Sequence, residues 1–202
     1  DLPYKKRREM SHDISVSTYS NLEINKLTIN DFNASDYFPK DYEIVKYSDL
    51  YKKNEESTAS ELIGKKAPDW ILENIEAQPV SLADCKSKII LINFTGIGCG
   101  ACQAAVPLLK QLKGLFTSEE FELIAIESWS RKVSAIRNYA NRKELNYTIL
   151  NATNEVIKQY QTGGAAPYFF IVDQERIIRK VIRGYSNENT DKEIINAIKE
   201  LL

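Results

Sequence analysis

Two cysteines, Cys99 and Cys102, are the residues best suited to covalent chemistry, and they stand in a C-x-x-C arrangement. This spacing is typical of a dithiol that opens and closes a disulfide, in which a thiolate attacks a disulfide sulfur. Two other readings are an inert pair and half of a zinc site, which needs two further ligands. The only other cysteine and the only histidine are Cys85 and His12. We expect Cys85 to be a small buried hydrophobic residue, and His12 to be solvated.

The residues around the pair indicate where it lies. The apolar run 88–94 predicts a strand buried on both faces, and the turn 95–98 follows it. A helix should begin at the cysteines, with Pro107 kinking it and Gly114 ending it. The partial positive charge of a helix N-terminus stabilises a thiolate. We therefore expect Cys99 to be the exposed nucleophile at the helix tip and Cys102 to face inward one turn later.

The remaining pattern from residue 61 onward alternates between strands and helices. We predict strands at 121–126, 147–150, 168–172 and 177–182, the last two forming a hairpin. Helices are predicted through 133–140 and 154–160, and a capping box at 190–193 should open a closing helix. This order favours an α/β fold with a central mixed sheet between helices.

Composition narrows the function classes. The 202 residues are 43% hydrophobic, which suits a globular core. With 27 basic and 28 acidic residues, no net field attracts nucleic acid or anionic lipid. No apolar run is long enough to span a bilayer, so we expect membrane attachment only through a removed anchor. The chain starts at Asp1 rather than at a methionine, which is compatible with processing.

Residues 1–60 differ from the rest, because they hold six of the 11 tyrosines and no glycine. We expect an N-terminal arm or the tail of an upstream domain, with short strands near 22–29 and 42–45 and a solvated linker at 52–57. The predicted division is thus 1–60 and 61–202.

The chain resembles the thioredoxin superfamily, and within it the TlpA/ResA-like branch of the cell envelope. The resemblance covers about residues 61–202 and includes the segments 63–70 and 80–82, the cysteine motif, and Ala166-Pro167 before an apolar strand. It implies a thioredoxin-like three-layer sandwich with Pro167 in cis. It also implies that the backbone of Ala166 pairs with the substrate chain. Gly100 and Ala101, between the cysteines, are expected to tune the redox properties. An ordinary turn proline is the alternative reading of Pro167.

The chain departs from the family pattern at several positions. Gly98 replaces the usual aromatic residue before the first cysteine, which we expect to open the site to a bulkier partner. Asn93 and Ala105 stand where relatives carry carboxylates that help move the proton of the inner thiol. Glu127 is a candidate substitute, although we expect a solvent-exposed carboxylate at this strand end.

The resemblance implies a thiol–disulfide oxidoreductase that needs no metal or cofactor. Its partners would be a protein disulfide or dithiol and an upstream redox protein, in the periplasm or cell envelope. The alternative is a catalytically weak binding or assembly module of a larger envelope protein. Copper-delivering relatives need a histidine ligand late in the fold, and this domain has none. Peroxidases need a lone peroxidatic cysteine with threonine and arginine around it, and this pattern is absent near Cys99.

Overall fold

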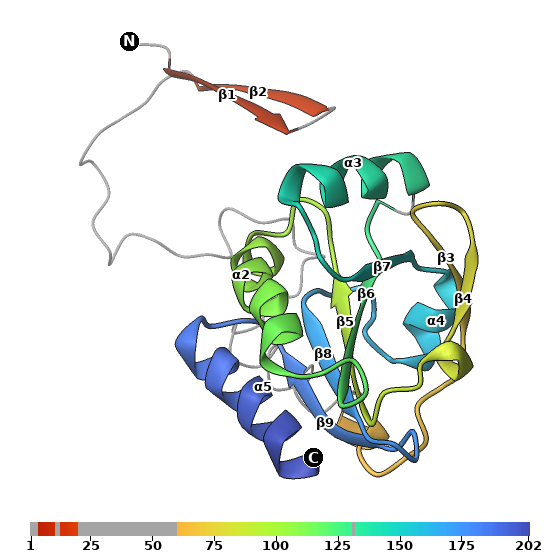
Figure 1. Cartoon of the computed structure of the whole chain (residues 1–202). Helices are drawn as coiled ribbons and strands as arrows, with labels where there is room; N and C mark the ends of the chain where they lie inside the picture. Colours follow the sequence, from red (N-terminus) through yellow and green to blue (C-terminus); the bar gives the residue numbers. More distant parts are fainter. Residues whose placement is uncertain (1–3, 11–12, 20–59, 131) are drawn as a thin grey trace, which may run out of the picture. The chain divides into compact units, whose positions relative to one another are not determined.

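A computed structural model describes residues 4–10, 13–19, 60–130 and 132–202. The chain divides into two compact units, Asp1–Tyr51 and Lys52–Leu202. In the first, β1 (Tyr4–Met10) pairs antiparallel with β2 (Asp13–Tyr19), a hairpin that we did not predict (Figure 1). The strands predicted near 22–29 and 42–45, the linker and His12 lie outside the described residues. The predicted boundary at residue 60 therefore stays a prediction.

The second unit contains a seven-stranded mixed sheet in the order β4-β3-β7-β6-β5-β8-β9. Strands β5, β6 and β7 run parallel, while β8 is antiparallel to β5 and to β9. This is the expected α/β fold, with two further strands, β3 and the edge strand β4, that the sequence pattern did not predict as strands. The bounds are β3 Ile71–Asn74, β4 Pro79–Ser81, β5 Ile89–Thr95, β6 Phe121–Glu127, β7 Thr148–Asn151, β8 Tyr168–Val172 and β9 Ile178–Arg183.

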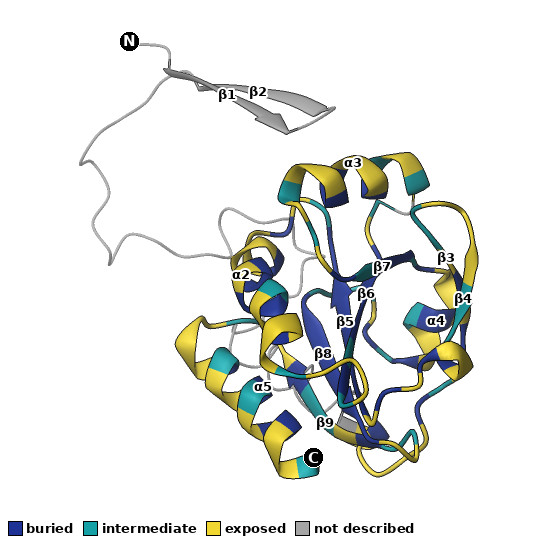
Figure 2. Ribbon diagram, viewed as in Figure 1, coloured by how far each residue is buried: buried dark blue, intermediate teal, exposed yellow. Residues whose placement is uncertain are grey.

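Strand β5 lies inside this sheet, between β6 and β8, and is buried along its whole length (Figure 2). Its side chains alternate between two apolar clusters, as the pleat of a strand requires. Ile90, Ile92 and Phe94 belong to one cluster, and Ile89 and Leu91 belong to the other. Burial on both faces explains why the sequence shows a continuous apolar run here. The strand therefore carries the turn at its carboxyl end on a rigid base.

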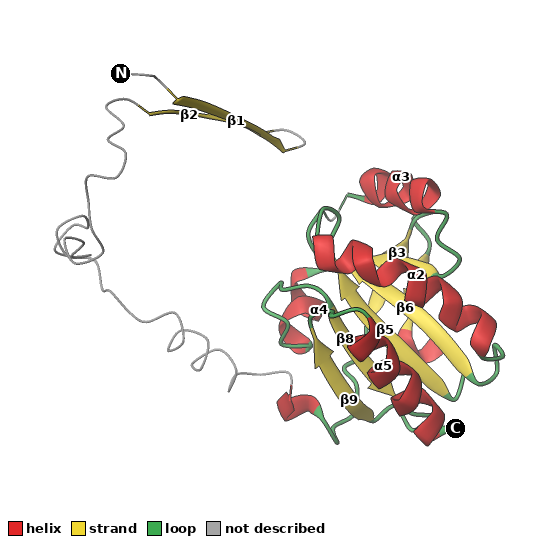
Figure 3. Cartoon of the chain, turned by 90° about the vertical axis from the view of Figure 1, so that its left-hand side faces the viewer, coloured by secondary structure: helices red, strands yellow, loops and turns green. Residues whose placement is uncertain are grey.

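Helices cover both faces of the sheet, which gives the expected three layers. On one face lie α2 (Gly100–Leu115), α3 (Val133–Lys143) and α5 (Glu188–Leu201), whose apolar residues share one cluster (Figure 3). On the other lie α4 (Asn154–Gln159) and the short 3-10 helices η3 (Ser60–Leu62) and η4 (Leu82–Asp84). Within the described parts of the chain, no helix combines the length and apolar character needed to cross a bilayer.

Two helix boundaries differ from the prediction. Helix α2 runs past Gly114 to Leu115, because Gly114 does not adopt the positive φ of a glycine that ends a helix. Helix α5 begins at Glu188, so the predicted capping box at 190–193 is wrong. Thr190 lies inside the helix, and its hydroxyl accepts a hydrogen bond from the Ser186 N–H (3.0 Å). The threonine thus satisfies a backbone donor before the helix rather than one within its first turn.

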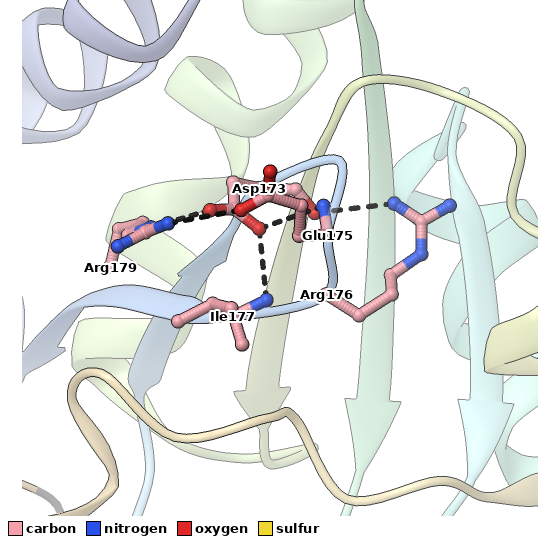
Figure 4. A network of polar contacts seen from close by, with 5 residues as sticks. All are labelled: Asp173, Glu175, Arg176, Ile177 and Arg179. Carbon is pink, nitrogen blue, oxygen red and sulfur yellow. Dashed lines mark hydrogen bonds and ion pairs between the residues drawn. The ribbon is translucent and has the colours of Figure 1, made fainter.

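The turn between β8 and β9 is organised by the Asp173 carboxylate (Figure 4). It accepts hydrogen bonds from the Glu175 and Ile177 N–H groups, both at 2.9 Å, and pairs with Arg179. Arg176, at φ 63°, donates to the Cys85 carbonyl (2.5 Å). Burial alone would raise the pKa of Asp173, but these hydrogen bonds and Arg179 outweigh it and hold the pKa below its usual value. The ionised carboxylate therefore stabilises the fold.

Replacing Asp173 by alanine should lower the free energy of unfolding by about 2 kcal/mol, because two backbone donors lose a charged acceptor. The wild type should lose part of this stabilisation as pH falls from about 4, the ordinary aspartate pKa, toward the depressed pKa of the folded state. Urea unfolding at pH 7 and pH 3 measures both effects. The control is Glu175→Gln, because the Glu175 side chain is 67% exposed and should change stability by less than about 0.5 kcal/mol. An equal effect of the two variants would contradict this prediction.

Candidate active site

The cysteine pair lies at the carboxyl end of β5, where the turn 96–98 leads into α2. Cys99 and Cys102 are joined by a disulfide with their Cα atoms 5.2 Å apart. Cys99 is the N-cap residue of α2, and its Sγ accepts the N–H of Cys102 at 3.1 Å. Its own N–H donates to the Gly96 carbonyl at 3.0 Å. The first sulfur thus occupies the position where helix N–H groups stabilise negative charge.

The expectation that Cys99 is exposed is wrong for this disulfide state. Cys99 is 6% exposed, while Cys102 is 2% exposed and faces inward as predicted. Two contacts explain the burial of Cys99, because its sulfur is bonded to Cys102 and lies 3.7 Å from the Ala166 carbonyl oxygen. A disulfide sulfur carries no hydrogen, so this approach is a contact in the present state.

Ala166 and Pro167 come from the loop before β8. Ala166 stands 67 residues after Cys99 in the sequence. The fold brings them to the disulfide because β8 pairs with β5, with Tyr168 opposite Phe94. The peptide bond between Ala166 and Pro167 is cis. Ala166 is partly exposed and Pro167 is buried. The backbone of Ala166 therefore lies next to the disulfide and is partly open to solvent.

The glycines that flank Cys99 leave its surroundings open. Gly98 and Gly100 are both exposed, and a Cβ built on either would meet no atom within 4 Å. Ala101, in the first turn of α2, is also exposed. Gly98 has φ 92°, a left-handed conformation that L side chains rarely adopt. An aromatic residue at this position would therefore strain the turn as well as cover the site.

Glu127 ends β6 and is fully buried, so the expectation of an exposed carboxylate is wrong. One carboxylate oxygen accepts the Ile97 N–H (2.8 Å), and the other accepts the N–H groups of Trp129 (2.9 Å) and Ser130 (2.8 Å). Burial raises the pKa of Glu127, and these three hydrogen bonds oppose the rise without cancelling it. Glu127 thus ties the cysteine turn to the loop after β6. Ile97 stands two residues before Cys99.

The positions without the family's carboxylates are both buried. Asn93 is 2% exposed, and with its amide nitrogen turned toward them it donates to the carbonyls of Phe94 (3.2 Å) and Tyr168 (3.3 Å). Ala105 is fully buried in the apolar cluster beneath α2. Neither residue can take up a proton from Cys102 as a carboxylate would.

Trp129 is a residue of this site that sequence reasoning missed. Its indole N–H donates to the Gly164 carbonyl at 2.8 Å, and its ring lies on Gly96, where an added Cβ would come within 2.4 Å of a ring carbon. The contact with Gly164 spans 35 residues, so no local pattern reveals it. The available signal was the place of this tryptophan directly after β6, whose carboxyl end adjoins that of β5.

Cys85 is the described cysteine outside the pair, and it is 3% exposed, as predicted for a buried hydrophobic residue. Burial raises the pKa of its thiol to about 12. Among the described residues, no group of three or more His, Cys, Asp and Glu side chains could hold a metal ion.

Comparisons with known proteins agree with this architecture. The model of the AhpC/TSA family matches residues 63–181. The thiol-disulfide oxidoreductase ResA of Geobacillus thermodenitrificans is 25% identical over 138 residues, which are 68% of this chain and 78% of the relative. ResA of Bacillus subtilis is 26% identical over 137 residues, covering 67% and 75% of the two chains.

Two solved structures share the fold. A thiol:disulfide interchange protein of the thioredoxin family from Chlorobium tepidum superposes with a TM-score of 0.58 at 23% identity, covering 67% of this chain and 94% of that one. The exposed lipoprotein thioredoxin of Streptococcus pneumoniae superposes with a TM-score of 0.56 at 18% identity, covering 66% and 100%. These neighbours bear out the thioredoxin-like fold expected from the sequence.

Proposed function

We propose that the substrates of this chain are protein disulfides or dithiols. The premise is that the chain belongs to the AhpC/TSA family and carries out thiol–disulfide exchange, as its ResA relatives are named to do. One observation carries the proposal. The Cys99–Cys102 disulfide stands at the N-terminus of α2, with the first sulfur 3.7 Å from the backbone of Ala166. A site built this way offers a substrate chain both a reactive sulfur and an adjacent backbone carbonyl.

The reaction begins from the reduced pair. The Cys99 thiolate attacks one sulfur of a substrate disulfide, a mixed disulfide forms, and the other substrate sulfur leaves as a thiolate that takes up a proton. Cys102 then loses its proton and attacks the Cys99 sulfur, which releases the second substrate thiol. The enzyme pair is left as the disulfide, and two electrons have passed to the substrate. A dithiol donor must reduce the pair again, and the reverse sequence oxidises a substrate dithiol.

The backbone next to Pro167 supports the choice of a protein as substrate. Ala166 is partly exposed beside Cys99, so an extended chain bonded to Cys99 would lie along it. The exposed surface at Gly98, Gly100 and Ala101 leaves room for that chain. We further propose that the dipeptide Gly100-Ala101 sets how readily the pair is reduced, since it carries no charged or bulky group between the sulfurs.

A turnover assay tests this function. The wild type should accelerate reduction of a peptide whose two chains are joined by a disulfide, with dithiothreitol as the electron donor. The variant Cys99→Ser/Cys102→Ser should run at the uncatalysed rate. Equal rates for the two proteins would show that the pair does not exchange with protein disulfides and would favour a binding module instead.

We also propose that the chain works in the cell envelope, since the branch that its motifs resemble acts in oxidising compartments, where disulfides persist. Fractionation of the source cells, followed by detection of the chain, tests this. Recovery with the soluble cytoplasmic marker would contradict it.

A further inference from the structure

Trp129 presents a large aromatic face to solvent beside the cysteine pair. The residue is anchored at two points, because its indole N–H donates to the Gly164 carbonyl and its backbone N–H donates to buried Glu127. Nevertheless, the residue is 47% exposed. An anchored indole that only served packing would be expected to bury more of its apolar surface.

The ring touches the two segments that meet at the reactive sulfur. Gly96, on which it rests, accepts the hydrogen bond of the Cys99 N–H. Gly164, which it hydrogen-bonds, stands two residues before Ala166, whose carbonyl contacts the Cys99 sulfur. Trp129 therefore contacts both backbone segments that meet at Cys99.

Rigid aromatic side chains bind polypeptides efficiently, because they offer apolar area while losing little conformational freedom. Here the indole hydrogen bond to Gly164 and the contact with Gly96 hold the ring in place before any partner arrives. This arrangement requires glycine at position 96, since any Cβ there would displace the Trp129 ring. The exposed glycine Gly98 keeps the neighbouring surface free of side chains.

We propose that Trp129 is a specificity-determining residue that packs against an apolar or aromatic side chain next to the attacked cysteine of a protein substrate. The inference rests on the proposed function and adds the substrate class, namely disulfides flanked by apolar residues. It assigns no role in the electron transfer to the indole.

The test compares three disulfides as substrates. Two are peptides that differ only in a phenylalanine or a serine next to one cysteine, and the third is bis(2-hydroxyethyl) disulfide. The wild type should prefer the phenylalanine peptide, and Trp129→Ala should lower kcat/KM for that peptide about tenfold. The other two substrates should change by less than about threefold. Trp129→Phe should keep most of the preference, because it keeps an aromatic face.

Ile71→Ala is the matched control, since Ile71 is an exposed apolar residue (73%) on β3, separated from β5 by β7 and β6. It should leave all three rates unchanged. An equal loss of Trp129→Ala on all three substrates, or no loss on any, would overturn the inference while leaving the proposed function in place. A wild type that accelerates none of the three exchanges would overturn the function and, with it, the inference.

Discussion

Cys99→Ser should reduce exchange with a protein disulfide by about 10³-fold or more, while Cys102→Ser should stop the reaction at a mixed disulfide with the substrate. The asymmetry follows from the structure. Cys99 caps α2 and its sulfur accepts the Cys102 N–H, whereas Cys102 is 2% exposed within the helix. We therefore expect the first sulfur to be the one that forms the thiolate and meets a partner once the pair is reduced. Mass spectrometry of acid-quenched reactions measures the mixed disulfide directly.

The control for this pair of variants is Cys85→Ala. Cys85 is buried in the apolar cluster on the α4 face of the sheet, and burial raises the pKa of its thiol to about 12. It should therefore take no part in exchange. Its replacement should leave the rate of exchange within about twofold of the wild type. If Cys99→Ser formed the mixed disulfide and Cys102→Ser did not, the roles assigned here to the two sulfurs would be wrong.

Glu127→Ala should lower the free energy of unfolding by about 3 kcal/mol and slow exchange at the same time. The buried carboxylate accepts three backbone N–H groups, from Ile97, Trp129 and Ser130, and these donors would remain without an acceptor. Glu127→Gln should cost less, about 1 to 2 kcal/mol, since its single carbonyl oxygen retains part of this set. Denaturant unfolding and the turnover assay measure the two effects.

The control is Glu119→Gln, which makes the same chemical change at an exposed position and should alter stability by less than about 0.5 kcal/mol. The variants also differ in pH dependence. Because burial raises the pKa of Glu127, ionisation opposes folding above the ordinary glutamate pKa of about 4.3. The stability advantage of the wild type over Glu127→Gln should thus be greatest below that pH and shrink as pH rises through the raised pKa. An advantage that grew with pH would contradict this account.

The sequence predicted those parts of the fold that depend on local pattern. A continuous apolar run such as 88–94 is typical of a strand buried on both faces, and β5 lies where the run predicts it. The turn 95–98 after this run predicts that the C-x-x-C motif begins a helix, and α2 does begin there. The pairing of β8 with β5 then brings Ala166 to Cys99, as the resemblance to the thioredoxin superfamily implied.

Two wrong predictions, the helix end at Gly114 and the capping box at 190–193, concern local helix boundaries, whereas those within the site concern contacts between distant segments. Exposure of Cys99 depends on the Ala166 carbonyl, which approaches from 67 residues away. Burial of Glu127 depends on the turn at Ile97, 30 residues earlier, which supplies a donor in place of water. The missed residue Trp129 makes its contacts with Gly96, 33 residues earlier, and with Gly164, 35 residues later. Hydrophobic period and helix propensity carry no information about such contacts.

The most direct test of the central claim is a redox titration of the pair. The wild type is equilibrated in buffers of defined thiol–disulfide poise, its free thiols are alkylated, and the product is weighed by mass spectrometry. A single two-electron transition confined to Cys99 and Cys102, and absent from Cys99→Ser, is the predicted result. If no disulfide formed between these residues at any poise, the account of this chain as a thiol–disulfide oxidoreductase would be contradicted.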